Sequence, residues 1–131
     1  MSTANEKLVT DFCNSFFSAD INKVVSYLTE DVYYHNIPWQ PVTGHAGVRK
    51  VLGPFIDRKD YVIEKMDIKK TASSGDVVMN ERVETWVKGS VRVELPVVGV
   101  FTIKGDKIVR WCDYFDSVTL APLLEPLKQA P

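Results

Sequence analysis

The feature that most constrains the fold is a series of long β-type segments in the second half of the chain. These segments are rich in β-branched and aromatic residues and are separated by short turns of glycine, serine, aspartate and lysine. The pattern predicts strands at about 61–72, 77–87, 90–103 and 107–116, and the short turns predict that consecutive strands pair antiparallel. The rest of the chain must then pack on one sheet.

The beginning of the chain has helical patterns instead. Thr3 and Glu6 have the spacing of a capping box, and apolar residues then recur at helical intervals to about Ala19. Asp20 is the expected N-cap of a short second helix. Two helices are therefore predicted before the first strand.

Three further segments complete the expected order of elements. A short strand is predicted over 31–37 and is ended by Pro38. A third helix is expected after Thr43 as its cap, and Pro54 should end or bend it because proline disrupts a helix interior. The tail, 117–127, contains two prolines and is either a short helix or an extended arm.

This order, helices first and antiparallel strands afterwards, predicts an α+β fold. The expected architecture is a strongly curved mixed or antiparallel β-sheet, with N-terminal helices that lie on one face and enclose a cone-shaped pocket. A chain of 131 residues is large enough for one substantial core and too small for two. We therefore expect a single domain over 1–131.

Composition excludes several classes of protein. A hydrophobic fraction of 45% and a charged fraction of 25% are typical of a soluble globular protein, and a net charge of -1 provides no basic surplus for nucleic acid. No apolar run approaches the roughly 20 residues that span a membrane. The two cysteines and two histidines have no metal-ligand spacing. We expect a cytoplasmic protein that binds no metal, nucleic acid or membrane.

One carboxylate has an unusual predicted environment. In the strand at 107–116, a period of two places Asp113 on the same face as Val109, Trp111 and Phe115. Burial of a carboxylate among apolar side chains is costly unless the charge is paired or hydrogen-bonded. The sequence must therefore provide partners for Asp113.

The strand at 77–87 offers suitable partners, because Arg82 and Glu84 are two residues apart and share a face. If that face is opposite Asp113, one guanidinium can bond both carboxylates, since arginine presents five donors. Repulsion between the carboxylates and their desolvation would raise one pKa, while the arginine holds the other down. Such a pair is expected in general acid-base catalysis.

Tyr34 and Asn36 also share a strand face and could fix a water molecule through a hydroxyl and an amide. Each of these interpretations has a structural alternative. Arg82 and Glu84 could be a solvated cross-strand pair, and Tyr34 and Asn36 could simply satisfy backbone groups at a strand end. From spacing alone the alternatives stay open.

Four segments taken together resemble a known family. Tyr34–Asn36, Glu81–Glu84, Gly99–Phe101 and Trp111–Asp116 are similar to the corresponding motifs of the limonene-1,2-epoxide hydrolase family, within the nuclear transport factor 2-like (SnoaL-like, cystatin-like) superfamily. The resemblance covers nearly the whole chain in order. It implies a deep pocket, usually in a homodimer, and a one-step reaction with no covalent enzyme intermediate, metal or organic cofactor.

The resemblance also implies a role for each polar residue. Asp113 would be the general base that takes a proton from water, and Tyr34 and Asn36 would hold that water. Glu84 would be the general acid that protonates the epoxide oxygen, and Arg82 would bridge the two carboxylates. The family usually has aspartate where this chain has Glu84, so the carboxyl at this position is one methylene further from the backbone.

The sequence thus predicts an epoxide hydrolase whose partners are a small lipophilic epoxide and water and whose product is a vicinal diol. The expected substrate-binding wall is apolar and consists of Trp86, Leu95, Val97, Val109, Trp111 and Phe115. Two alternatives remain on the same fold. One is a polyketide-cyclase-like or epoxide-opening cyclase, and the other is a non-catalytic small-molecule-binding domain.

Overall fold

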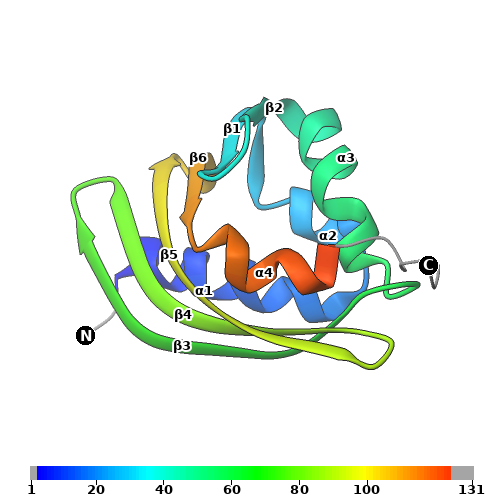
Figure 1. Ribbon diagram of the computed structural model, residues 1–131. Helices are drawn as coiled ribbons and strands as arrows, with labels where there is room; N and C mark the ends of the chain where they lie inside the picture. Colours follow the sequence, from blue (N-terminus) through cyan, green and yellow to red (C-terminus); the bar gives the residue numbers. More distant parts are fainter. Residues whose placement is uncertain (1–2, 125–131) are drawn as a thin grey trace.

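The computed structural model describes residues 3–124. Its centre is a curled six-stranded sheet with the strand order β2-β1-β6-β5-β4-β3, in which β1 and β6 are parallel and all other neighbours are antiparallel (Figure 1). The strands are β1 (Leu28–Asn36), β2 (Val42–Thr43), β3 (Val62–Ser74), β4 (Val77–Lys88), β5 (Val91–Lys104) and β6 (Lys107–Tyr114).

The helices lie on the concave side of this sheet, where β3, β4 and β5 bend around them (Figure 1). They are α1 (Ala4–Asn14), the 3₁₀ helix η1 (Ser15–Ser18), α2 (Ile21–Val25), α3 (Gly44–Ile56) and α4 (Ser117–Leu124). Helix α3 packs on β1, and α4 packs on β5. The predicted α+β class, with a strongly curved mixed sheet covered by helices, is confirmed.

The three predicted N-cap residues all precede a helix, and two of them make a capping hydrogen bond. The Thr3 hydroxyl accepts a hydrogen bond from the Glu6 backbone N–H at 3.0 Å, and Asp20 Oδ1 accepts one from the Asn22 N–H at 2.9 Å. Each bond satisfies one of the N–H groups left without a partner at a helix start. The third helix also begins after its predicted N-cap residue, Thr43, but the Thr43 side chain makes no capping hydrogen bond.

Proline is tolerated in two helices. Pro54 lies in the last turn of α3, which continues to Ile56, so the helix does not end at the proline. The tail forms the predicted short helix over 117–124, with Pro122 inside it. Residues 125–127 of the predicted tail lie outside the described part of the chain.

The predicted alternation fails at one point in β6. Ile103 pairs with Ile108 and Thr102 pairs with Arg110, so Val109 is an extra residue opposite β5. Such a bulge reverses which side chain points inward. Ile108 is fully buried and Val109 only partly buried, and Val109 does not line the apolar pocket to which Trp111 and Phe115 contribute. The prediction that Val109 belongs to the substrate-binding wall is therefore wrong.

An aromatic cluster joins the helices to the sheet. Phe12 of α1 meets the ring of Trp111 edge-on at a centroid distance of 4.8 Å. The ring of Tyr34 stacks on that of Trp111 at a centroid distance of 3.9 Å. Aromatic pairs of this kind contribute about 0.5–1.5 kcal/mol each beyond the area they bury. The cluster holds β1 and β6 together where the polar side chains of the pocket project.

Candidate active site

The sheet register brings together polar residues from distant parts of the sequence. Asn36 on β1 pairs with Asp113 on β6, Asp113 pairs with Gly99 on β5, and Gly99 pairs with Asn80 on β4. These four residues form one row across four neighbouring strands. The row lies on the face that also carries Arg82, since residues two apart on β4 point the same way.

Arg82 joins both candidate carboxylates. Its side chain is 1% exposed, and its Nε donates to Glu84 Oε2 and its Nη2 to Asp113 Oδ2, each at 2.8 Å. A third donor, Nη1, bonds Asn80 Oδ1 at 2.8 Å. Burial lowers the pKa of Arg82, but Asp113 and Glu84 raise it well above its usual range, so the group stays cationic.

Gly99 makes the bridge possible. A Cβ at this position would lie 2.5 Å from Arg82 Nη1 and 2.6 Å from Phe101 Cε1. The guanidinium therefore crosses β5 directly over the glycine to reach Asp113 on the next strand. A side chain of any size would obstruct that path.

Asn80 is the polar partner that the sequence interpretation missed. It accepts from Arg82 and donates from Nδ2 to Cys13 Sγ at 3.6 Å. Burial raises the pKa of the Cys13 thiol to about 11, although Arg82 opposes this, so the thiol stays neutral. The signal was present in the sequence, because Asn80 lies two residues before Arg82 on the same strand face.

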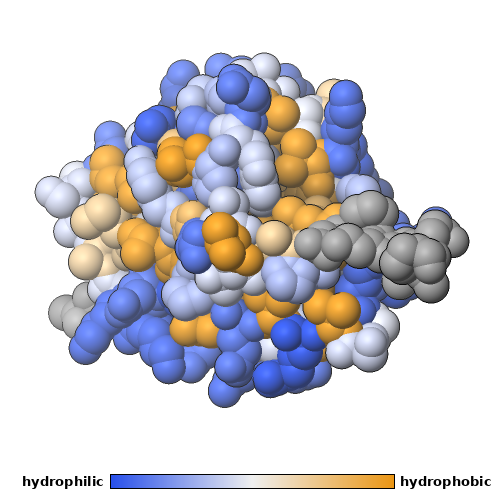
Figure 2. All heavy atoms as spheres, in the orientation of Figure 1, coloured by the Kyte–Doolittle hydropathy of each residue, from blue (hydrophilic) through white to orange (hydrophobic). Residues whose placement is uncertain are grey.

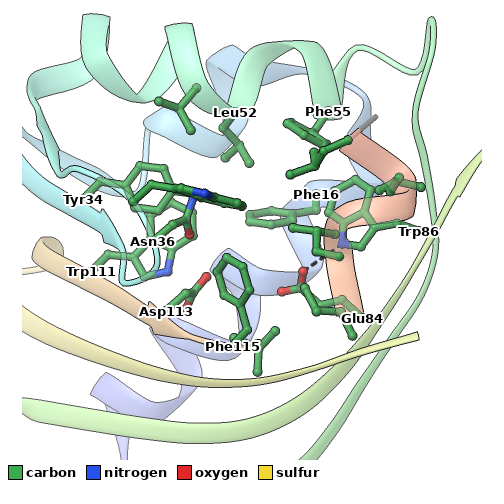
Figure 3. A pocket seen from close by; sticks show the side chains of 17 residues that line it. Phe16, Tyr34, Asn36, Leu52, Phe55, Glu84, Trp86, Trp111, Asp113 and Phe115 are labelled. Atoms are coloured by element: carbon green, nitrogen blue, oxygen red, sulfur yellow. Dashed lines mark hydrogen bonds between the residues drawn. The ribbon is translucent and has the colours of Figure 1, made fainter. Parts of the chain in front are cut away.

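Glu84 accepts hydrogen bonds on both carboxyl oxygens. Arg82 Nε occupies Oε2, and the indole Nε1 of Trp86 donates to Oε1 at 2.9 Å (Figure 3). Glu84 and Trp86 are each 5% exposed. The carboxyl group is therefore held from two sides.

Asp113 differs in that one oxygen is left open. Oδ2 accepts from Arg82, whereas Oδ1 is buried and has no hydrogen-bond partner among residues 3–124. Burial raises the pKa of Asp113 and the charge of Glu84 raises it further, whereas Arg82 and the nearby indole N–H of Trp111 lower it. The Trp111 Nε1 atom is, like Asp113 Oδ1, buried without a hydrogen-bond partner among residues 3–124. Because Asp113 lines the main pocket, the open oxygen belongs to a group that can exchange a proton there.

Tyr34 and Asn36 flank Asp113 on the same side of the pocket, and Glu84 lies on the opposite side (Figure 3). Asn36 Nδ2 donates to Tyr34 Oη at 2.9 Å. Burial, followed by the charge of Asp113, raises the pKa of Tyr34 well above its ordinary value, so its O–H remains a donor. An O–H donor and an amide oxygen thus lie near the open carboxylate.

The pocket is apolar apart from these groups and has a volume of about 220 Å³. Five residues of the predicted wall line it: Trp86, Leu95, Val97, Trp111 and Phe115. Others come from the helices and one loop, and the sequence interpretation assigned them to the core or left them out: Phe16, Trp39, Val51, Leu52, Phe55, Leu120, Leu123 and Leu124. Their apolar helical periodicity is the same for a core and a pocket wall.

Apolar groups also surround α4 on the outside of the molecule. Trp39 is 42% exposed and meets the ring of Phe115 edge-on at 5.4 Å. Val118 of α4 is 76% exposed, and Figure 2 shows apolar side chains across the middle of the face that α4 occupies. The aromatic pair of Trp39 and Phe115 thus connects the pocket wall to this surface.

Within residues 3–124, no three histidine, cysteine, aspartate or glutamate side chains come together in a group that could hold a metal ion. The helices over the same range include none that is long and apolar enough to cross a membrane.

Comparison with known families gives a match over most of the chain. The profile of the family described as the limonene-1,2-epoxide hydrolase catalytic domain matches residues 3–124. This range includes every polar residue of the pocket described above.

Individual relatives agree with this match. The chain is 28% identical over 108 residues to the epoxide hydrolase EphG of Mycobacterium tuberculosis, covering 82% of this chain and 70% of that protein. The solved structure of a limonene-epoxide-hydrolase-like epoxide hydrolase from M. tuberculosis superposes with a TM-score of 0.80 at 25% identity, covering 92% of this chain and 89% of that one.

A third comparison concerns the fold alone. The structure of a SnoaL-like polyketide cyclase candidate from Shewanella putrefaciens has a TM-score of 0.79 at 12% identity, covering 95% of this chain and 98% of the other. This likeness shows the fold alone, and function must be argued from the side chains.

Proposed function

The chain belongs to the limonene-1,2-epoxide hydrolase family, and we propose that it adds water to a lipophilic epoxide in one step to give a vicinal diol. The observation that carries the proposal is the asymmetric carboxylate pair. Asp113 lines an apolar pocket, and its buried Oδ1 has no hydrogen-bond partner among residues 3–124, while Arg82 connects its other oxygen to Glu84.

Asp113 is the general base. Oδ1 accepts one hydrogen of the attacking water, the amide oxygen of Asn36 accepts the other, and the Tyr34 hydroxyl donates to the water oxygen. This arrangement leaves one lone pair to attack an epoxide carbon. The Asn36–Tyr34 hydrogen bond supports it, because one N–H of the Asn36 amide donates to the tyrosine oxygen and leaves the tyrosine hydrogen free to point to the water.

Glu84 is the general acid. As water attacks, the C–O bond of the epoxide breaks, and the proton of Glu84 moves to the leaving oxygen. Asp113 is then protonated and Glu84 ionised, and transfer of one proton between them restores the resting state. Arg82 keeps a positive charge next to whichever carboxyl is ionised, and no metal or organic cofactor takes part.

The apolar wall sets the class of substrate. Indole, phenyl and aliphatic side chains from the sheet and from α3 and α4 surround the two carboxyl groups. Burial of apolar substrate surface against them contributes about 25 cal/mol per Å² and also excludes bulk water from the carboxyl groups. A lipophilic epoxide of modest size is therefore the expected substrate.

A panel of lipophilic epoxides, some fused to a carbocycle and some on an open chain, tests this function. The wild type should form diol from at least one lipophilic member, and Asp113→Asn should lower kcat/KM by roughly 10²- to 10⁴-fold, the usual contribution of general acid-base catalysis. Asp106→Asn, in the exposed turn before β6, is the matched control and should leave the rate unchanged. Absence of diol from every epoxide would contradict the proposal.

The same experiment addresses both alternatives. A cyclase would convert a substrate with its own nucleophile without adding oxygen from water. A non-catalytic domain would bind the panel without turnover, and Asp113→Asn would change affinity alone.

Two further predictions accompany the proposed function. The homodimer that the family resemblance implies and the cytoplasmic location expected from the sequence composition stay predictions. Sedimentation equilibrium at micromolar concentration should give twice the chain mass of 14.8 kDa. Fractionation of cells that express the protein should recover it with cytoplasmic markers.

A further inference from the structure

We propose that Trp86 is a positioning residue for the reaction, in which its indole N–H holds the Glu84 carboxyl in one orientation beside Arg82. The inference rests on the proposed role of Glu84 as general acid. It gives Trp86 a polar function in addition to its place in the apolar wall.

The first support is the geometry along β4. Residues two apart on one strand face are separated by roughly 6.6–6.8 Å, and Glu84 lies midway between Arg82 and Trp86. Its carboxyl receives Arg82 Nε from one side at 2.8 Å and Trp86 Nε1 from the other at 2.9 Å. With both oxygens bonded, the carboxyl group cannot rotate without losing a hydrogen bond in a buried site.

The second support is that Trp86 is itself held in place. Its ring meets Phe55 of α3 edge-on at a centroid distance of 5.7 Å and contacts Phe16 at 6.5 Å. Phe55 in turn packs on Tyr61 at 4.3 Å. These contacts fix the plane of the indole, so the direction of its N–H is set by packing that does not depend on Glu84.

The third support is the length of the Glu84 side chain. Removing one methylene would move the carboxyl about 1 Å closer to the backbone. The 2.9 Å contact with the indole would then be too long for a good hydrogen bond. The indole donor is therefore matched to a glutamate and would not serve an aspartate at this position. Because the indole bond depends on the length of the Glu84 side chain, substitutions of Trp86 and Glu84 should have non-additive effects, which a double-mutant cycle can measure.

The kinetic test is a cycle of Trp86→Phe, Glu84→Asp and the double variant. Phenylalanine keeps an aromatic ring between Phe16 and Phe55 but lacks the donor. Trp86→Phe should lower kcat about 10- to 100-fold, as expected from misplacing a catalytic group, and should cause little further loss in the Glu84→Asp background. An equal loss of kcat in both backgrounds would overturn the proposal.

A second readout does not need turnover. The indole N–H resonance of Trp86, distinguishable from those of Trp39 and Trp111 by assignment, should shift in Glu84→Asp while the other two stay in place. An unchanged Trp86 resonance would overturn the proposal even if the enzyme is active. If no epoxide is hydrolysed, the proposed function fails, and this measurement alone decides whether the indole holds Glu84.

Discussion

The two carboxylates bonded to Arg82 lie in different surroundings. At one end, Asp113 has one bonded oxygen and one buried oxygen without a partner among residues 3–124, next to Tyr34 and Asn36. At the other end, both oxygens of Glu84 accept hydrogen bonds. The same guanidinium thus connects an open carboxylate to a closed one.

This difference suits Asp113 to the role of general base and Glu84 to the role of general acid. An open oxygen can take up a proton from a bound water, and it needs room for that water. A carboxyl held on both sides can deliver a proton to one place, and it needs a fixed orientation. Differences between the surroundings of two titratable groups are what separate a base from an acid.

Removal of the shared cation should produce the largest effect because it breaks both ends. Arg82→Ala leaves the ionised member of the buried carboxyl pair without its counter-charge, and we expect the free energy of unfolding to fall by about 3–5 kcal/mol. Urea unfolding monitored by tryptophan fluorescence measures it. Arg92→Ala, an exposed arginine on β5, is the control and should change stability little. A small loss in Arg82→Ala would mean that the two carboxyls are neutral or solvated.

The same chemical change at each end should have unequal effects on stability. In Asp113→Asn, the amide oxygen can keep the Arg82 bond while the NH₂ group takes the open side. In Glu84→Gln, the NH₂ group must face either Arg82 or Trp86, both donors, so one buried bond is lost at a cost of about 1–3 kcal/mol. Equal free energies of unfolding for the two variants would contradict the distinction between open and closed ends.

A methyl group at Gly99 should disturb the end of the guanidinium that bonds Asn80 and Asp113. Gly99→Ala introduces a Cβ 2.5 Å from Arg82 Nη1, and the displaced side chain and strained packing should cost about 1–3 kcal/mol and reduce kcat. Gly53→Ala on α3 is the matched control, since a Cβ there meets nothing within 4 Å. If both variants are equally stable and active, Arg82 does not need the path across β5.

The smallest predicted effect is a dependence of stability on pH. Burial raises the pKa of Asp113 above the value of about 3.9 that it has in the unfolded chain. Its stabilising contribution is therefore complete below that value and is lost as the pH rises through the folded pKa. Relative to Asp113→Asn, the wild type should lose free energy of unfolding as the pH rises above about 4 and through the folded pKa of Asp113. A constant or rising difference would contradict the raised pKa.

The pH dependence of activity follows from the same shift. The base must be ionised and the acid protonated, so kcat/KM should follow a bell-shaped curve whose limbs belong to the coupled pair. Since burial raises the pKa of Asp113, the acidic limb should lie above the ordinary aspartate range. A flat profile from pH 4 to pH 9 would contradict an acid-base pair.

Much of this arrangement follows from simple periodicity. A period of two placed Arg82, Glu84 and Trp86 on one face of β4, and the turns after β3, β4 and β5 agree with the predicted hairpins. The Asp113 environment was also predictable, because a carboxylate between Trp111 and Phe115 requires a partner. Local patterns were sufficient here because strand geometry is regular.

Other features depend on contacts between distant segments, which local patterns do not contain. The bulge at Val109 depends on how β6 pairs with β5 and reverses the expected alternation. The path over Gly99 depends on a register across three strands. The indole bond to Glu84 depends on the packing of Trp86 against Phe55, and that contact joins a helix to the sheet.

A single turnover in water enriched in oxygen-18, with enzyme in excess over an epoxide from the active panel, tests the central claim most directly. If Asp113 activates water for direct attack, the diol of the first turnover carries one heavy oxygen. Unlabelled diol in the first turnover would mean that the oxygen came from a carboxylate of the enzyme through a covalent intermediate. That result would contradict the one-step reaction proposed for this pocket.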